Sequence, residues 1–236
     1  AIAELLISKG HTVIGTGRRQ EKLDELKTQL GDKFIPLNFD VSDLSATKTA
    51  LQTLPNDLLT NIDVLVNNAG LALGLEPADK TDFADWQQMV NTNILGLIHL
   101  THEILPFMVA NNDGYIINLS STAGNYPYFG GNVYGATKAF VTQFSLNLRA
   151  DLVGKNIRVS NIEPGLCGGT EFSNIRFHGD DAKAAQVYDS VQYVTPQDIA
   201  NMVAWLIEQP KHVNINRIEV MPTAQTFAGL KVVKDL

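Results

Sequence analysis

This chain of 236 residues contains one cysteine and carries no net positive charge. The single cysteine, Cys167, excludes an internal disulfide framework and a cysteine-cluster metal site, and it fits a reducing compartment such as the cytoplasm. The 18 Lys and Arg residues are outnumbered by 25 Asp and Glu residues, which gives a formal net charge of −7. This acidic balance argues against a nucleic-acid partner, because binding phosphate groups needs a basic face.

Long hydrophobic runs are also absent. No apolar run approaches the ~20 residues of a membrane span, and the opening stretch, which contains Glu4, has the pattern of a helix rather than of a secretion signal. We therefore expect no membrane segment. The chain is long enough to bury a large core. The lack of repeats, low-complexity segments and Pro/Ser-rich linkers predicts one domain over residues 1–236.

Two kinds of segment alternate along the sequence and predict an α/β fold. Short apolar runs rich in β-branched residues occupy 11–17, 34–40, 62–70, 114–121, 157–165 and 215–222. Segments with helical periodicity occupy 1–10, 20–30, 43–54, 82–111, 133–154 and 196–209, and Thr195 before Pro196 predicts a capped start for the last of them. Strands that alternate with long helices form βαβ units. The pattern predicts a Rossmann-type, doubly wound parallel sheet flanked by helices.

The chain begins inside a helix, whereas a doubly wound sheet normally opens with a strand and a glycine-rich turn. The glycines of Gly15-Thr16-Gly17 do not supply that turn, because Gln20 occupies the third glycine position of a GxGxxG fingerprint. We therefore expect 13–17 to be the second strand. The first strand and its turn are expected ahead of Ala1, in about fifteen residues.

Ser121, Tyr134 and Lys138 form the strongest candidate for a catalytic group. Tyr134 and Lys138 are four residues apart in the sequence YGATK, so they share one face of a helix. Ser121 ends a predicted strand at the edge where open α/β sheets bind ligands. A free tyrosine has a pKa of about 10, and we expect the lysine cation to lower it. The trio can then move a proton to or from an alcohol or carbonyl.

Five short motifs follow one another along the chain. They are Asp40-Val41, NNAG at 67–70, Asn93, Ser121 thirteen residues before the tyrosine of YGATK, and Pro164-Gly165. In this order they resemble the short-chain dehydrogenase/reductase family, and the resemblance covers nearly the whole chain. It is closer still to a branch of NADP-dependent dehydrogenases of serine, L-allo-threonine and related 3-hydroxy acids. That closer resemblance is carried by 67–78, 130–149, 161–181 and 212–222.

The resemblance implies a role for each catalytic residue. Tyr134 is the expected acid/base. Lys138 is expected to lower its pKa and to hold the nicotinamide ribose, and Ser121 to polarise the substrate oxygen. Asn93 is expected to kink its helix and to anchor a proton-relay water, with an ordinary helix-surface asparagine as the alternative.

The resemblance also implies which residues hold the cofactor. Asp40 and Val41 are expected to contact the adenine, and 67–70 to line its ribose, although a purely structural role is the alternative for both groups. The loop 164–172 is expected to close over the nicotinamide, and its glycines let the backbone approach closely. Thr170 lies six residues after Pro164 instead of the family's usual five, which leaves its contact open. The full predicted set is Arg18, Arg19, Asp40, Val41, Asn67, Asn68, Ala69, Gly70, Tyr134, Lys138, Pro164, Gly165, Leu166, Cys167, Gly168, Gly169, Thr170, Glu171 and Phe172.

Arg18 and Arg19 predict NADP rather than NAD as the cofactor. Dehydrogenases that select NAD usually place Asp or Glu at the end of the second strand, to bind the ribose 2′-hydroxyl. Here two guanidiniums stand at that place, and no carboxylate precedes Glu21. They can clamp a 2′-phosphate, whereas the alternative is that both arginines are solvated surface charge.

Arg176 is the candidate for the carboxylate of the substrate, beside Ser121 and Tyr134. It lies in 170–181, where family members place a mobile substrate lid, and a guanidinium supplies both charge and orientation. The alternative is that Arg176 pairs with Asp180 and Asp181 and only orders the lid. No residue is predicted to bind a metal.

The sequence thus predicts an NADP-dependent oxidoreductase that interconverts a small 3-hydroxy acid and its 3-oxo acid or semialdehyde. The alternatives are an NADPH-dependent reductase of other carbonyl compounds, a non-catalytic dinucleotide-binding regulator, and epimerisation or dehydration on the same scaffold.

The resemblance also implies a homotetramer paired through helices near 82–110 and 133–153. Phe140, Phe144 and Leu148 form an apolar stripe on the second of these, for which core packing is the alternative explanation.

Overall fold

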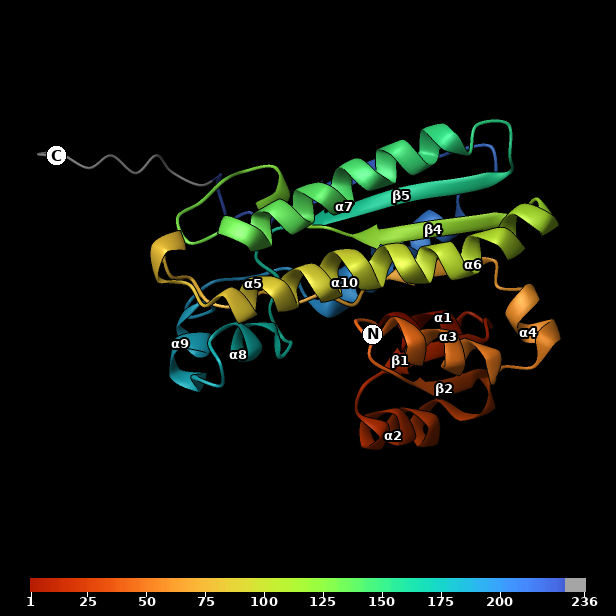
Figure 1. The fold of residues 1–236 in the computed structure, drawn as a ribbon, viewed down its shortest axis with the longest axis horizontal. Helices are drawn as coiled ribbons and strands as arrows, with labels where there is room; N and C mark the ends of the chain where they lie inside the picture. The colour runs from red at the N-terminus through yellow and green to blue at the C-terminus, as the bar shows by residue number, and fades with distance from the viewer. Residues whose placement is uncertain (228–236) are drawn as a thin grey trace, which may run out of the picture.

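The structure, a computed structural model, describes residues 1–227, and its strands form two parallel sheets (Figure 1). The smaller sheet pairs β1 (Val13–Gly17) with β2 (Phe34–Asn38). The larger has the order β3 (Val64–Asn67), β4 (Gly114–Leu119), β5 (Ile157–Pro164) and β6 (Arg217–Val220). The predicted parallel sheet flanked by helices is confirmed.

The sheet differs from the prediction in one respect, because β1 and β3 are not paired with each other. Each is an edge strand with a single partner, so the one sheet expected is present as two.

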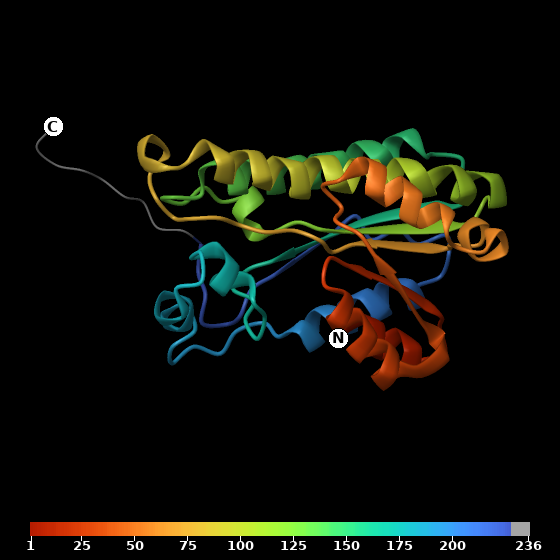
Figure 2. The same ribbon diagram turned by 60° about the horizontal axis from the view of Figure 1, so that its bottom comes forward.

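The helices alternate with these strands as predicted. They are α1 (Ile2–Ser8), α2 (Gln20–Leu30), α3 (Leu44–Gln52), α4 (Asn56–Thr60), α5 (Phe83–Val90), α6 (Leu97–Asn111), α7 (Asn132–Asp151), α8 (Phe172–Arg176), α9 (Asp181–Gln186) and α10 (Pro196–Glu208). Short 3₁₀ turns are η1 (Gly31–Lys33), η2 (Ala78–Lys80) and η4 (Thr122–Gly124), and η3 (Asn91–Gly96) is a π-helical segment between α5 and α6. The predicted cap is confirmed: Thr195 and Asp198 form a capping box at the start of α10. In Figure 2 the larger sheet lies between the layer of α5, α6 and α7 and the layer of α10.

Strand residues of alternate position face opposite layers. Ile116 of β4 packs with α6 and α7, whereas Tyr115 and Ile117 pack with α10. Both faces of β4 are therefore buried, which explains its unbroken apolar sequence.

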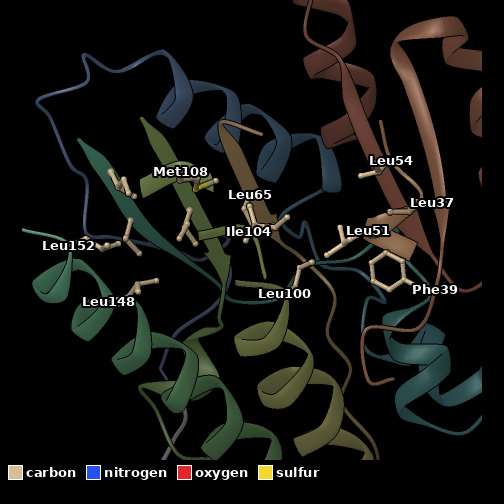
Figure 3. Packing of buried hydrophobic residues seen from close by; sticks show 13 residues of the cluster. Leu37, Phe39, Leu51, Leu54, Leu65, Leu100, Ile104, Met108, Leu148 and Leu152 are labelled. Atoms are coloured by element: carbon tan, nitrogen blue, oxygen red, sulfur yellow. The ribbon is translucent and has the colours of Figure 1, made fainter. Parts of the chain in front are cut away.

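One hydrophobic cluster joins the two sheets, and Figure 3 shows its members. The side chains Leu65, Leu100, Ile104, Met108, Leu148 and Leu152 from the larger sheet and its helices continue into Leu37, Phe39, Leu51 and Leu54 around β2 and α3. The smaller sheet is thus held against the larger one by helix packing, of α3 on α6 and of α1 on α10, rather than by strand pairing.

Gly15 in β1 has a packing role. A Cβ added there would lie 2.3 Å from the ring of Phe34 on the neighbouring strand. Since the ring is fully buried, a larger residue would displace it. This explains a glycine that fails the dinucleotide fingerprint.

The long central helix lies where the sequence predicted it, at 82–111, but its length and hydropathy were not expected. α5, η3 and α6 form one helix of 29 residues, and an 18-residue window of it has a mean hydropathy of 1.3, long and apolar enough to cross a membrane. In the sequence, polar residues such as Glu103 interrupt the apolar run, so no unbroken run of membrane-spanning length is visible. The helix packs on the larger sheet through Leu100, Ile104 and Met108. The core helix of a soluble protein can have the same length and composition. In this structure 33% of the 18-residue window is buried.

Candidate active site

Ser121, Tyr134 and Lys138 come together at the carboxyl end of β4. The Ser121 hydroxyl accepts a hydrogen bond from Ala123 N at 3.1 Å and donates one to Pro164 O at 3.2 Å. Tyr134 and Lys138 lie one turn apart on α7, and both are buried. All three line a cavity of about 790 Å³, within the roughly 300–1,000 Å³ of small-molecule sites.

Lys138 is anchored by one hydrogen bond and retains free donors. Its Nζ donates to Leu119 O at 2.9 Å and lies 5.9 Å from the centroid of the Tyr134 ring. An ammonium has three donors, so two stay available to a ligand within the described part of the chain. Gly70 keeps the space in front of them open, because a Cβ there would lie 3.2 Å from Nζ. Burial lowers the pKa of Lys138 to about 8.

Burial raises the pKa of Tyr134 to about 12, although the Ser121 hydroxyl and the Arg176 guanidinium act to lower it. The expected lowering by Lys138 is therefore not found in this structure, because loss of hydration outweighs the nearby charges. Tyr134 keeps its proton at neutral pH. In this state it is a proton donor to a substrate oxygen.

Asn93 lies at the distorted centre of the long helix, where η3 is a π-helical segment. Its side chain is buried and forms two hydrogen bonds with the backbone of Leu71, from Leu71 N at 2.9 Å and to Leu71 O at 2.8 Å. A third bond runs to Thr137 Oγ1 at 3.0 Å. The surface position considered as the alternative is wrong. Asn93 joins the long helix to the loop after β3 and to α7.

The loop after β5 forms one wall of the cavity. Its lining residues are Pro164, Gly165, Leu166, Cys167, Thr170, Glu171 and Phe172. Gly168 and Gly169 do not line it, and a Cβ at Gly168 would approach the Tyr193 ring to 2.7 Å. Burial raises the pKa of the Cys167 thiol, which therefore stays protonated and is a weak nucleophile.

The NNAG segment divides between the cavity and the core. Asn68, Ala69 and Gly70 line the cavity. Asn67 is buried beneath them, and its Nδ2 donates to Asn118 Oδ1 at 2.8 Å and to Thr101 Oγ1 at 3.0 Å. Its side chain joins β3 to β4 and α6, which is the structural role considered as the alternative.

Arg18 and Arg19 follow β1 and reach different partners. Arg18 Nη1 lies 3.4 Å from Asp40 Oδ2, and Arg19 pairs with Glu171 through two bonds of 3.0 and 2.7 Å. Arg19 and Glu171 line the cavity, whereas Arg18, Asp40 and Val41 do not. Both arginine side chains are more than half exposed. Exposed ion pairs contribute little stability, so either arginine can exchange its partner for a phosphate.

Arg176 ends α8 and lies beside the acid/base candidate. Its Nε donates to Gly74 O at 3.1 Å and its Nη2 to Tyr128 Oη at 2.8 Å. Its Cζ lies 5.5 Å from the centroid of the Tyr134 ring. Arg176 is half-buried and lines the cavity, so the structure unites it with Ser121 and Tyr134 as predicted for a substrate site.

The aspartates after α8 do not pair with Arg176. Asp180 caps α9 and lies 3.5 Å from Lys183, and Asp181 accepts a hydrogen bond from Asn174 at 2.6 Å. The alternative in which they neutralise Arg176 is therefore wrong. Among residues 1–227 no carboxylate lies within ion-pair distance of this guanidinium.

Several cavity residues were not predicted from the sequence. They include Leu71, Leu119, Tyr128, Tyr188 and Gln225. Gln225 Oε1 accepts a hydrogen bond from Leu166 N at 2.7 Å, and Tyr188 Oη donates to Cys167 O at 3.2 Å. Each holds the loop after β5 from another part of the chain. No periodicity or spacing in the sequence marks such contacts.

A buried carboxylate lies directly behind this loop. Glu163 is fully buried, and its two oxygens accept bonds from Arg217 Nε and Nη2, both at 2.7 Å. The amides of Asn161 and Asn125 donate to it as well, each at 2.6 Å. Asn125 follows the turn that begins at Ser121, so this network joins the serine turn, β5 and β6.

The cavity fits an anionic dinucleotide. Its walls supply the Lys138 ammonium, the Arg19 guanidinium and the backbone of a glycine-containing loop. Glu171 is its only lining carboxylate within residues 1–227, and Arg19 holds it. Within the same residues no group of three or more His, Cys, Asp or Glu could hold a metal ion.

A parallel sheet flanked by helices, with a cavity at the carboxyl ends of its strands, has the ligand position of the doubly wound α/β class of protein. The chain belongs to the short chain dehydrogenase family, whose model matches residues 1–180. It is 66% identical over its whole length to a probable NADP-dependent dehydrogenase of Haemophilus influenzae, covering 93% of that protein. It is 55% identical, over 98% of its length and 93% of the relative, to the NADP-dependent 3-hydroxy acid dehydrogenase YdfG of Escherichia coli K12.

A solved structure agrees with these relatives. The closed form of serine dehydrogenase complexed with NADP+ superposes with a TM-score of 0.97 at 55% sequence identity, covering 99% of this chain and 94% of the other.

Proposed function

We propose that this chain is an NADP-dependent dehydrogenase that interconverts a small 3-hydroxy acid and its 3-oxo acid or semialdehyde. The predicted cofactor, NADP, is confirmed by relatives named NADP-dependent and by the NADP+ of the serine dehydrogenase structure. The predicted enzyme class is confirmed with it: the chain is an oxidoreductase of hydroxyl groups. The choice of a 3-hydroxy acid is the proposal, and relatives of that name support it.

The chain's own residues divide the chemistry between them. Bound NADP supplies or accepts the hydride. Tyr134 donates its phenolic proton to the substrate oxygen during reduction. Oxidation is the reverse of this transfer and needs the Tyr134 phenolate, which takes the proton from the alcohol. The Ser121 hydroxyl hydrogen-bonds the same oxygen. Lys138 is placed to bind ribose hydroxyls through its free N–H groups. Asn93 fixes the loop after β3 beside these residues.

One observation carries the substrate class: the guanidinium of Arg176 lines the cavity 5.5 Å from the Tyr134 ring and has no carboxylate partner within residues 1–227. A half-buried cation is costly unless an anion compensates it. A small acid supplies that anion and offers few other contacts for selection. The reacting oxygen must reach Tyr134, which suits a short acid.

Replacing Arg176 with leucine tests the substrate class. We expect kcat/KM for a 3-hydroxy acid to fall about 100-fold or more, because a charged hydrogen-bonding partner is lost. Activity on an uncharged alcohol of similar size should change little. Lys183→Leu is the matched control, since Lys183 is a cation of the same segment outside the cavity. Equal losses on both substrates would make Arg176 structural.

A panel of 3-hydroxy acids with NAD and NADP in parallel separates the other functions. NADPH oxidation with an aldehyde but with no 3-oxo acid would favour a reductase of other carbonyl compounds. A regulator that only binds the dinucleotide would oxidise no NADPH with any substrate. Product analysis distinguishes epimerisation and dehydration from the oxidation of the hydroxyl group.

We also propose a homotetramer paired through the two long helices. Leu148 is buried in the core, whereas Phe140 is 37% and Leu95 40% exposed. Phe140 stacks on Phe144 with ring centroids 5.9 Å apart. The predicted stripe is thus divided between core and surface, and its outer part is free to meet another subunit.

Light scattering at micromolar concentration should give the mass of four chains. Association would remove exposed apolar side chains such as Phe140 and Leu95 from water, which favours it. A stable monomer in this measurement would contradict the proposal. Phe140→Lys should shift the mass towards smaller species.

A further inference from the structure

Two side chains on the lid side of the cavity, Arg176 and Tyr128, have hydrogen-bond donors without an acceptor in the described part of the chain. Arg176 has five N–H groups, of which one on Nε and one on Nη2 are bonded, to Gly74 O and Tyr128 Oη. Because Tyr128 Oη accepts that bond, its own proton must point elsewhere. No acceptor for it is found within residues 1–227. Both side chains are half-buried and line the cavity.

The guanidinium of Arg176 is shared between two tyrosine rings. Its Cζ lies 5.6 Å from the ring centroid of Tyr128 and 5.5 Å from that of Tyr134. The backbone fixes this arrangement as well, since Gly74 N donates to Arg176 O at 2.8 Å. Tyr128 and the acid/base candidate therefore contact the same cation, and a ligand of that cation lies within reach of both.

This end of the cavity attracts anions. Glu171, the only lining carboxylate within residues 1–227, is held in two bonds by Arg19. Arg176 is thus left without a counter-charge, with a phenolic O–H beside it. A carboxylate has two oxygens and about four acceptor sites, so it can satisfy guanidinium and phenol together.

We propose that Tyr128 is a second binding residue for the substrate carboxylate. Its hydroxyl accepts a hydrogen bond from Arg176 and donates a hydrogen bond to the carboxylate that Arg176 binds. This inference rests on the proposed function, because it requires an acid substrate at Arg176. It assigns selectivity for acids to two side chains, one from the loop before α7 and one from α8.

Tyr128→Phe tests the role, because it keeps the ring under the guanidinium and removes only the hydroxyl. We expect KM for 3-hydroxypropionate to rise about 10-fold or more, the usual effect of losing a hydrogen bond to a charged group. The effect on kcat should be smaller. The values for methyl 3-hydroxypropionate, which has the same skeleton without the charge, should stay within about two-fold, since ordinary surface changes have small effects.

Calorimetric binding provides a readout independent of turnover. Propionate and propionamide are titrated into the enzyme saturated with NADP+. We expect wild type to bind propionate more tightly, and Tyr128→Phe and Arg176→Leu each to weaken propionate about 10-fold without weakening propionamide. Tyr115→Phe is the matched control, because that hydroxyl is bonded to Ser160 at 2.7 Å and lies outside the cavity. Thermal unfolding of both phenylalanine variants verifies that they fold.

The outcomes separate this inference from the proposed function. If Arg176→Leu impairs only the acid and Tyr128→Phe impairs neither substrate, the role of Tyr128 is overturned and the proposed function stands. If Tyr128→Phe impairs acid and ester alike, Tyr128 merely holds the lid and the inference is wrong. If wild type binds propionate no better than propionamide, the acid substrate itself is wrong, and both fall.

Discussion

Tyr134→Phe should lower turnover by about 100-fold or more, the usual scale of an acid–base contribution, and leave NADPH binding nearly unchanged. The phenol holds its proton at neutral pH because burial raises its pKa to about 12, so the variant deletes a proton that is present and needed. The ring itself remains, and with it the contact with Phe172, whose centroid lies 5.9 Å away. Turnover and a fluorescence titration of NADPH measure the two effects separately.

A second buried phenol provides the control. Tyr115 lies in β4, and its hydroxyl is bonded to Ser160 at 2.7 Å, away from the cavity. Tyr115→Phe should lower thermal stability by the modest amount typical of one hydrogen bond and should keep turnover close to wild type. Near-normal turnover in Tyr134→Phe would remove that residue from the chemistry.

Replacing Arg18 and Arg19 together with alanine should raise KM for NADP about 10- to 100-fold and KM for NAD little. A phosphate dianion bonded to two guanidiniums loses its charge-assisted hydrogen bonds in this variant. The present partners, Asp40 and Glu171, form exposed ion pairs that a phosphate can replace. Parallel kinetics with the two cofactors measure the change in selectivity.

Lys22→Ala is the matched control for this pair. Lys22 lies one turn further along, on α2, and is bonded to Glu25 at 2.8 Å. Loss of its charge changes the surrounding electrostatic potential but leaves the two arginines that are proposed to bind the 2′-phosphate. Neither KM should therefore change by more than about two-fold, the range of ordinary surface substitutions. Equal increases for NAD and NADP in the double variant would refute the clamp.

The sequence specified those parts of the site that depend on local geometry. Tyr134 and Lys138 had to share a face because they are four apart on a helix, and Ser121 had to lie at the strand edge because the run before it is a strand. These positions are what the structure shows. Their functional roles remain predictions.

Contacts between distant segments could not be read in this way. Tyr128 reaches the cavity from a loop, and its partner Arg176 is 48 residues away in the chain. The pairing of Arg19 with Glu171 spans 152 residues. The raised pKa of Tyr134 was also missed, because burial depends on all the elements packed around a residue, whereas spacing reports only its neighbours on one helix.

The pairing of Glu163 with Arg217 has a consequence for the order in which the chain becomes complete during synthesis. The carboxylate belongs to β5, whereas the cation that neutralises it arrives 54 residues later, on β6. Until β6 has left the ribosome, a nascent chain cannot bury the Glu163 carboxylate without leaving a charge unpaired. The wall of the cavity beside it should therefore stay open on the emerging chain, and final closure should coincide with the docking of β6.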